Sequence, residues 1–342
     1  MKYLKSKERL KEYLALKGNI PALALRDFVS THAWMPFEVI WQPFVLSLNA
    51  TLSILGSLGS LHYIIRFGSQ LFTGRVSDAI GRKRIQVFAS IFTISTFVIC
   101  FVGRSWELLI PGVILYAFSY ALWEPAGAAM VAESIDKKQR GIAYSLIELT
   151  WVVPGFYAPI IFGYLAETLG FSPIFAIILP IEILALLILL IFIKETLPLK
   201  KKLDFHGMFT SLKEIVRPKS GLIRFYVFAI VITLSWSMQL SIFFGMIYDT
   251  YHLTYSQLGA MYTAACVVKA LFQLPAGKII DKYGRKRILL LSEVVGLVVV
   301  TGYLLSQDFQ GFLLSYALFG LFSSLFNPAY LAYLSDAATT EE

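Results

Sequence analysis

Charged residues are scarce in this chain. Only 15% of its 342 residues are Asp, Glu, Lys or Arg, whereas 57% are hydrophobic. An ordinary soluble domain carries about 25% charged residues. This composition excludes an ordinary soluble globular domain.

Cysteine and histidine are also few, at 2 and 4 residues. Cys100 and Cys266 lie in apolar segments of different halves of the chain, so we expect no disulfide between them. The sequence contains no cluster of His or Cys at metal-ligand spacing, no phosphate-binding Gly-Lys-Ser/Thr loop and no nucleophile elbow. We therefore expect no enzymatic activity, no cofactor and no ATP-driven transport within this chain.

Long apolar segments are what the sequence has instead. Ten of them approach the length of about 20 residues that a helix needs to cross a bilayer. They are continuously apolar, unlike the alternating strands of a membrane barrel. They cover residues 22–47, 50–73, 85–103, 108–132, 141–166, 172–193, 225–248, 256–276, 288–305 and 310–334. The sequence therefore predicts an all-α polytopic membrane protein.

The net charge of +8 is unevenly placed. Lys and Arg gather in the N-terminal tail and in alternate connections, which are residues 74–84, 136–140, 194–224 and 277–287. Arg104 is the one basic residue in a connection on the opposite side. By the positive-inside rule, we expect a plasma-membrane protein with a cytoplasmic N-terminus. The basic balance then requires no nucleic-acid partner.

One twelve-residue loop occurs twice. Residues 74–85 read GRVSDAIGRKRI and residues 277–288 read GKIIDKYGRKRI, with seven positions identical and an offset of 203 residues. The same offset pairs Gly56 with Gly259, Pro125 with Pro328, and Glu133 with Asp336. An offset that persists over this distance indicates two homologous halves, a construction common among transporters.

The repeat divides the chain into three parts. We expect a six-helix bundle over residues 1–195, a basic cytoplasmic linker over 196–224 and a partial bundle of four helices over 225–342. The linker is either an amphipathic connector on the membrane surface or a disordered segment. By the offset, Glu342 corresponds to Gln139. We therefore expect a twelve-helix protein truncated at its C-terminus, rather than a natural ten-helix protein.

The pattern G-x-x-x-D-x-x-G-R-K-R at residues 74–84 and again at 277–287 resembles the signature loop of the major facilitator superfamily. The stretch from Glu133 to Gly141 and the motif Glu195–Pro198 are similar to further motifs of that superfamily. The resemblance covers essentially the whole chain. It implies a two-bundle fold with an incomplete second half. It also implies a monomeric secondary transporter in the lipid bilayer, moving a small-molecule substrate by alternating access.

The loop residues also have a chemistry of their own. Gly81 permits a tight turn, and Asp78 and Arg82 on either side of it can form an ion pair partly out of water. Glu133 can join this pair as a third member. The alternative is that these charges only set topology. The complete predicted set is Gly74, Asp78, Gly81, Arg82 and Glu133, repeated as Gly277, Asp281, Gly284, Arg285 and Asp336.

In the superfamily, such charges latch the two halves together on the cytoplasmic side in the outward-open state. The resemblance implies that each loop Asp faces the N-terminal end of a helix in the opposite half, where the helix dipole favours an anion. Asp281 would face the helix that starts near Gly141. The corresponding partner of Asp78 would lie on a helix beyond this sequence.

Charges inside the apolar segments are costly, at about 3 kcal/mol each on insertion scales, so each one predicts a site. Arg66 and Lys269 occupy equivalent positions in the two repeats, which suggests a shared architectural role or a role in substrate binding. Arg66 can pair with Glu124 or Glu148, and Asp27 can approach these carboxylates. A carboxylate left over in a low dielectric can bind and release a proton near neutral pH. The alternative is a fully neutralised structural network.

The first apolar segment carries two further candidates, His32 and Glu38. The resemblance implies that helices 1, 4, 7 and 10 line the central cavity. His32 either titrates or serves as a hydrogen-bonding packing residue, and Glu38 lies towards the outer side, within reach of water. The resemblance also implies that Glu182 and Glu293, in helices 6 and 9, lie away from the cavity.

The function that we expect is proton-coupled export of a drug or metabolite, with Glu124, Glu148 or Asp27 carrying the proton. The Pro154-Gly155 and Pro159…Gly163 pattern is a degenerate form of a motif associated with antiporters in the superfamily. Two alternatives remain at this stage. One is a proton-coupled importer of a sugar or organic acid, and the other is a non-transporting sensor or scaffold derived from a carrier.

Overall fold

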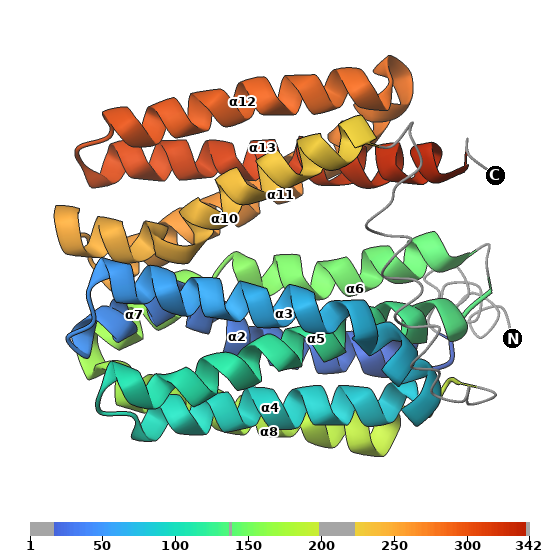
Figure 1. Cartoon of the computed structure of the whole chain (residues 1–342), viewed down its shortest axis with the longest axis horizontal. Coiled ribbons are helices and arrows are strands. Elements are labelled where there is room, and N and C mark those ends of the chain that lie inside the picture. Colours follow the sequence, from blue (N-terminus) through green and yellow to red (C-terminus); the bar gives the residue numbers. More distant parts are fainter. Residues whose placement is uncertain (1–16, 137–138, 198–222, 340–342) are drawn as a thin grey trace, which may run out of the picture. The chain divides into compact units, whose positions relative to one another are not determined.

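The computed structural model describes residues 17–136, 139–197 and 223–339, and all regular elements in these ranges are helical. The first half contains α2 (Ile20–Ser47), α3 (Leu52–Ile80), α4 (Arg82–Val102), η1 (Trp106–Leu109), α5 (Ile110–Glu133), α6 (Arg140–Gly155), α7 (Ala158–Leu169) and α8 (Phe171–Phe192). The second half contains α10 (Ile223–Tyr251), α11 (Tyr255–Tyr283), α12 (Arg285–Leu305) and α13 (Phe309–Thr339) (Figure 1). The predicted all-α fold is confirmed. The predicted linker at 196–224 lies almost entirely outside the described residues.

The duplication is visible in the helix boundaries. α3 and α11 are both 29 residues long, and α4 and α12 are both 21 residues long. Their first and last residues are related by the same offset of 203 as the sequence repeat. Thr51 and Thr254, which cap α3 and α11 with their side chains, share that offset as well. The two halves therefore fold alike at the level of local structure.

The helices extend further than the apolar segments because the loop residues continue the preceding helix. α3 and α11 end only at Gly81 and Gly284, whose φ angles are +117° and +88°. Side chains rarely adopt this region of φ, so a glycine ends the helix here without steric cost. The predicted role of these two glycines in a tight turn is confirmed.

The fifth predicted segment is not one helix. α6 ends at Gly155 and α7 begins at Ala158. Between them, the N–H groups of Phe156 and Tyr157 donate to carbonyls only three residues back, at 3.2 and 3.1 Å. Pro159 follows in the first turn of α7, where its missing N–H is not needed. The prediction of one continuous helix over 141–166 is wrong at this point, although 142–169 together is long and apolar enough to span a membrane.

Seven helical stretches among the described residues are long and apolar enough to cross a membrane by composition and length. The three long helices outside this set are α2, α3 and α11. They carry Asp27, Arg66 and Lys269, three of the charges that the sequence analysis selected. Each of the three long helices outside the set therefore holds a candidate site residue.

The described residues form two compact units, and each is described by itself. Unit 1 comprises residues 1–34, 44–151 and 169–243, and unit 2 comprises residues 35–43, 152–168 and 244–342. In unit 1, α8 lies against α4, and a buried apolar cluster joins α2, α5, α6 and α8 around Ile20, Met130 and Leu189. In unit 2, α11, α12 and α13 pack around Ile280 and Leu325.

Candidate functional site

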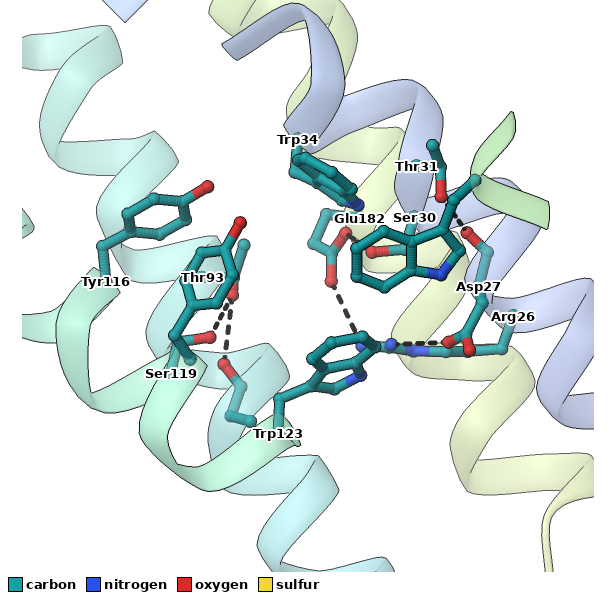
Figure 2. Close-up of a pocket in the computed structure, with 13 residues that line it drawn as sticks. Arg26, Asp27, Ser30, Thr31, Trp34, Thr93, Tyr116, Ser119, Trp123 and Glu182 are labelled. Carbon is teal, nitrogen blue, oxygen red and sulfur yellow. Dashed lines mark hydrogen bonds and ion pairs between the residues drawn. The ribbon is translucent and has the colours of Figure 1, made fainter. Parts of the chain in front are cut away.

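A pocket in unit 1 brings polar and aromatic side chains together from five helices (Figure 2). It contains about 480 Å³ of space, including the part that opens to solvent. The lining residues are Arg26, Asp27, Ser30, Thr31 and Trp34 of α2, Ala89 and Thr93 of α4, Tyr116, Ser119, Tyr120 and Trp123 of α5, Trp151 of α6 and Glu182 of α8. The pocket is therefore built from the first half of the duplicated chain.

A buried charge triad of Arg26, Asp27 and Glu182 occupies one side of this pocket (Figure 2). One guanidinium nitrogen of Arg26 donates to Asp27 Oδ1 at 2.9 Å, and the other lies 3.7 Å from Glu182 Oε1. The three side chains are 6%, 9% and 1% exposed. Two carboxylates thus share one guanidinium in a site that is largely shielded from solvent.

Two serines hold the triad in place. Ser30 donates from Oγ to Glu182 Oε2 at 2.6 Å, and Ser90 accepts a hydrogen bond from Arg26 at 2.9 Å. Because these serines come from α2 and α4, the triad is fixed by three helices. Its geometry is therefore set by the packing of the unit rather than by any one helix.

Aromatic rings form the rest of the wall. Trp151 lies between two other tryptophans, with ring centroids 5.0 Å from Trp34 and 5.1 Å from Trp123. Tyr116 and Tyr120 meet edge to face at 5.1 Å. Such rings offer large apolar faces with a negative quadrupole, which suit a planar aromatic molecule or a cation.

Two parts of this pocket differ from the sequence analysis. The resemblance places Glu182 away from the central cavity, whereas in the structure Glu182 lines this pocket, because α8 presents it to α2. Arg26 was not selected, although an Arg-Asp pair within an apolar segment is an available signal. Asp27 was a candidate and lines the pocket. Its ion-pair partner is Arg26, and neither Glu124 nor Glu148 lines the pocket.

Arg66 and Glu124 form an ion pair close to the pocket, with Nη2 3.1 Å from Oε2. Gln70 donates to the same carboxylate oxygen at 2.7 Å, and the Arg66 guanidinium lies 4.5 Å from the ring centroid of Tyr120. Of the two partners considered for Arg66, Glu124 is the one that the structure pairs with it. The Glu124 side chain is 49% exposed. Here one carboxylate meets one guanidinium, so no carboxylate is left over.

The remaining intramembrane candidates are His32, Glu148, Glu38 and Lys269. His32 donates from Nδ1 to the carbonyl of Phe28 at 2.7 Å, which matches the packing alternative. Glu148 is exposed on α6. Glu38 and Lys269 are partly buried in unit 2, and each interacts with neighbouring groups. Within unit 1, neither His32 nor Glu148 lines the pocket that contains Asp27.

The loop network of Asp78, Arg82 and Glu133 is formed as the sequence predicts. Arg82 pairs with Asp78 one turn earlier and with Glu133 Oε1 at 3.2 Å. Its side chain is 11% exposed, so the pairs lie partly out of water, as expected. The network joins the ends of α3 and α5 to the start of α4.

Glu195 is a further member of this network that the charge analysis did not include. Its carboxylate accepts from the backbone N–H of Arg82 at 2.9 Å and of Lys83 at 3.2 Å, at the N-terminus of α4. These N–H groups have no partner within the helix, and the helix dipole favours an anion there. Thr196 donates to Glu133 Oε2 at 2.6 Å. The signal in the sequence was the motif that begins at Glu195.

The second copy of the loop is described only in part. The side chains of Asp281 and Asp336 lie outside what the structure describes, and the surroundings of Gly141 are not described either, so the predicted contact of Asp281 stays a prediction. A Cβ atom at Gly74 or Gly277 would meet nothing within 4 Å. Close packing against the described residues of its own unit therefore does not explain the first glycine of either loop.

Alanine substitutions at the loop glycines are expected to affect the stability of the protein to different degrees. Gly81→Ala places a Cβ at a φ of +117° and against the Glu195 carboxylate, and we expect it to destabilise the protein by about 1–3 kcal/mol. Gly284→Ala meets only the φ penalty, at about 1 kcal/mol. Gly74→Ala, in an open helical position, is expected to be neutral or stabilising. Thermal unfolding of the purified variants measures this order, and equal midpoints for Gly81→Ala and Gly74→Ala would contradict it.

Comparison with known proteins identifies the family. A family model described as the Major Facilitator Superfamily matches residues 28–248 and 225–342. The chain belongs to the major facilitator superfamily. The prediction of this family from the two loops is confirmed, and the family is one of multi-pass membrane transporters.

Curated relatives of this major facilitator protein include multidrug resistance proteins. The chain is 29% identical over 237 residues to a multi-drug resistance efflux pump PmrA homolog of Lactococcus lactis, with 66% of this chain and 56% of that protein covered. It is 24% identical over 311 residues to multidrug resistance protein 2 of Bacillus subtilis, with 89% and 77% covered. The chain thus spans little more than half the length of the Lactococcus relative.

Solved structures show the same fold. The nucleoside transporter NupG aligns with a TM-score of 0.71 at 13% identity, over 91% of this chain and 81% of that one. A bacterial homolog of the human lysosomal transporter Spinster aligns with a TM-score of 0.68 at 15% identity, over 94% and 74%. At this level of identity, the likeness concerns the major facilitator fold alone.

Proposed function

We propose that the protein is a proton-coupled secondary transporter that exports small aromatic, cationic molecules by alternating access. The observation that carries this proposal is the buried pocket in which the Arg26–Asp27–Glu182 triad lies beside three tryptophans. The multidrug relatives support the same substrate class. The charge distribution supports a plasma-membrane protein with a cytoplasmic N-terminus, and we propose that it acts as a monomer.

The substrate class follows from the chemistry of the pocket. The triad carries a net charge of −1 when both carboxylates are ionised, and an uncompensated buried charge costs several kcal/mol. A cation in the pocket removes this deficit. The rings of Trp34, Trp123 and Trp151 add cation–π attraction and apolar contact, each of which is stronger out of water.

Proton coupling follows from the same charge balance. A proton on Asp27 or Glu182 also neutralises the triad, so a proton and a cationic substrate satisfy one and the same deficit. Glu124 has no such deficit, because Arg66 compensates it. We therefore propose that the proton is carried by Asp27 and Glu182 rather than by Glu124 or Glu148.

The loop network has a separate role in this cycle, at the cytoplasmic ends of the helices. We propose that Asp78, Arg82, Glu133 and Glu195 hold the cytoplasmic ends of the first bundle rigid, so that the bundle moves as one body. The equivalent residues of the second repeat, from Gly277 to Asp336, would do the same for the second bundle. Gating residues and pocket residues then have separate tasks.

Transport into inside-out membrane vesicles tests the proposal. With an inside-acid pH gradient and ethidium as the planar cationic probe, we expect uptake that a protonophore abolishes. Trp151→Ala removes the central ring of the wall. We expect it to raise the ethidium concentration at half-maximal uptake about tenfold, which is the scale of a buried aromatic anchor. Trp106→Ala, outside the pocket, is the matched control.

Three results would contradict the proposal. Uptake that is absent under every gradient would favour the sensor or scaffold alternative. A Trp151→Ala variant that transports like Trp106→Ala would separate the pocket from the substrate. If uptake were driven only by an outward gradient of a sugar or organic acid, the alternative of a proton-coupled importer would be favoured.

A further inference from the structure

Gln86 is a buried polar residue on α4 that contacts the wall of the pocket from outside it. Gln86 is 2% exposed, and its Nε2 donates a hydrogen bond to the backbone carbonyl of Trp123 in α5 at 2.9 Å. Trp123 lines the pocket (Figure 2), whereas Gln86 does not. The hydrogen bond therefore acts on the backbone that carries the ring, and not on a bound molecule.

The Trp123 carbonyl lies in a part of α5 that a proline weakens. Pro125 is inside the helix. A proline there has no N–H to donate to the carbonyl four residues earlier, which is that of Ala121, and its ring crowds that carbonyl. In membrane helices, side chains from neighbouring helices compensate for such a break. Gln86 supplies a hydrogen bond from α4 to this weakened turn.

Gly127 provides the space that the Gln86 amide occupies. A Cβ atom at position 127 would lie 3.1 Å from Nε2 of Gln86, which is closer than ordinary van der Waals contact. Even the smallest side chain here would push the amide away from its position. The hydrogen bond thus depends on Gln86, Trp123 and Gly127 together.

The second repeat has the proline but not the hydrogen bond. The pairs at an offset of 203 are Gln86 and Leu289, Trp123 and Phe326, Gly127 and Tyr330, and Pro125 and Pro328. Leu289 cannot donate a hydrogen bond, and it is buried in an apolar cluster against which Phe326 and Tyr330 pack. The polar contact and its glycine therefore belong to the repeat that builds the pocket. A break at the proline alone does not require them.

The same face of α4 supports the rest of the pocket. Gln86, Ser90 and Thr93 are spaced at i, i+4 and i+7, which places them on one side of the helix. Ser90 accepts a hydrogen bond from Arg26 at 2.9 Å. The hydroxyls of Thr93 and Ser119 lie 2.6 Å apart. One face of α4 thus holds the charge triad on one side and the α5 wall on the other.

We propose that Gln86 is a positioning residue that sets the orientation of Trp123, and through it the affinity of the pocket for a planar cation. The class of substrate rests on the proposed function, but the effect on the Trp123 ring does not. Without the hydrogen bond, the turn before Pro125 moves relative to α4, and the ring no longer keeps its place beside Trp151. A site whose supporting contacts are loosened loses affinity even though all its lining residues are present.

Two variants each remove one hydrogen bond between α4 and α5. Gln86→Leu removes the amide donor, and Thr96→Val, the matched control, removes the hydroxyl that donates to the Gly112 carbonyl at 3.1 Å. Each variant installs the residue of the second repeat at the equivalent position, Leu289 or Val299. Neither Thr96 nor Gly112 lines the pocket. We expect the two variants to unfold at similar temperatures, so a difference in the pocket would not be one of stability.

The position of the Trp123 ring can be measured without a ligand. In the purified protein labelled with fluorotryptophan, the fluorine NMR signal that disappears in Trp123→Phe belongs to this ring. We expect Gln86→Leu to shift this signal and to broaden or divide it, because the ring then exchanges between orientations. Thr96→Val should leave the signal as in the parent. A Trp123 signal that coincided in Gln86→Leu and the parent would overturn the proposal.

Binding of ethidium, followed by its own fluorescence anisotropy, measures the consequence for affinity. We expect Gln86→Leu to raise the Kd about fivefold, the scale of one hydrogen bond, and Thr96→Val to leave it unchanged. In a Trp123→Ala background, Gln86→Leu should have no further effect, because it acts through this ring. An equal rise in Kd with and without Trp123 would reveal a general loosening of the bundle, which contradicts a positioning role.

Gly127→Val is a second variant, which displaces the same amide from the side of α5 and serves if Gln86→Leu does not fold. We expect it to shift the Trp123 signal and raise the Kd in the same direction. If the parent bound no ethidium while the signal still shifted, the proposed substrate class would fail and the positioning role would stand. If the parent bound ethidium and neither signal nor Kd changed, the positioning role would fail and the proposed function would stand.

Discussion

Arg26→Met is expected to destabilise the protein by about 3–5 kcal/mol, the scale of an ion pair broken in a buried site. The substitution leaves Asp27 and Glu182 as two buried carboxylates without a cation between them. The same change at Arg66 is expected to cost about 1 kcal/mol or less. There the carboxylate of Glu124 is half exposed.

Thermal unfolding of the purified variants in detergent measures this difference. Adding Asp27→Asn and Glu182→Gln to Arg26→Met removes the uncompensated charge, so most of the lost stability should return. If Arg26→Met unfolded at the same temperature as Arg66→Met, the triad would not be a buried charge set.

Glu182→Gln is expected to abolish the pH dependence of substrate binding. The factor by which protonation changes the affinity for substrate should fall by about tenfold or more. The variant leaves Asp27 alone with Arg26, and that pair has no charge deficit for a proton to fill. Glu124→Gln should keep the pH dependence, since Glu124 already has Arg66 and Gln70 as partners. This replaces the expectation, drawn from the sequence, that Glu124 is a leading proton carrier.

Binding of ethidium to the purified protein, measured as quenching of tryptophan fluorescence across a pH series, distinguishes the two carboxylates. Glu182→Asp keeps a carboxylate and serves as the conservative control. A pH dependence that vanished in Glu124→Gln and persisted in Glu182→Gln would return proton binding to the Arg66–Glu124 pair.

Much of the fold could be predicted because it depends on local sequence patterns. The offset of 203 residues predicted matching helices, and the ends of α3 and α11 obey it. Gly81 and Gly284 predicted the turns that their φ angles show. The pairing of Asp78, Arg82 and Glu133 followed from short connections between neighbouring helices, which leave few alternative partners.

The candidate pocket could be predicted much less well. The helices that build it are apolar almost all round, so periodicity does not indicate which face turns inwards. Glu182 reaches Arg26 only through the packing of α8 beside α2, across 156 residues of chain. The contact of Glu167 with Ser256 likewise depends on how α7 meets α11. No local sequence pattern predicts either of these two contacts.

Proton flux that accompanies substrate movement tests the central claim most directly. The protein would be reconstituted into liposomes loaded with a pH-sensitive dye, and ethidium would be added outside without an imposed gradient. The account predicts that entry of the cation drives protons out through the wild-type protein, and that this proton movement is lost in Glu182→Gln. Entry of ethidium with no movement of protons would contradict the account.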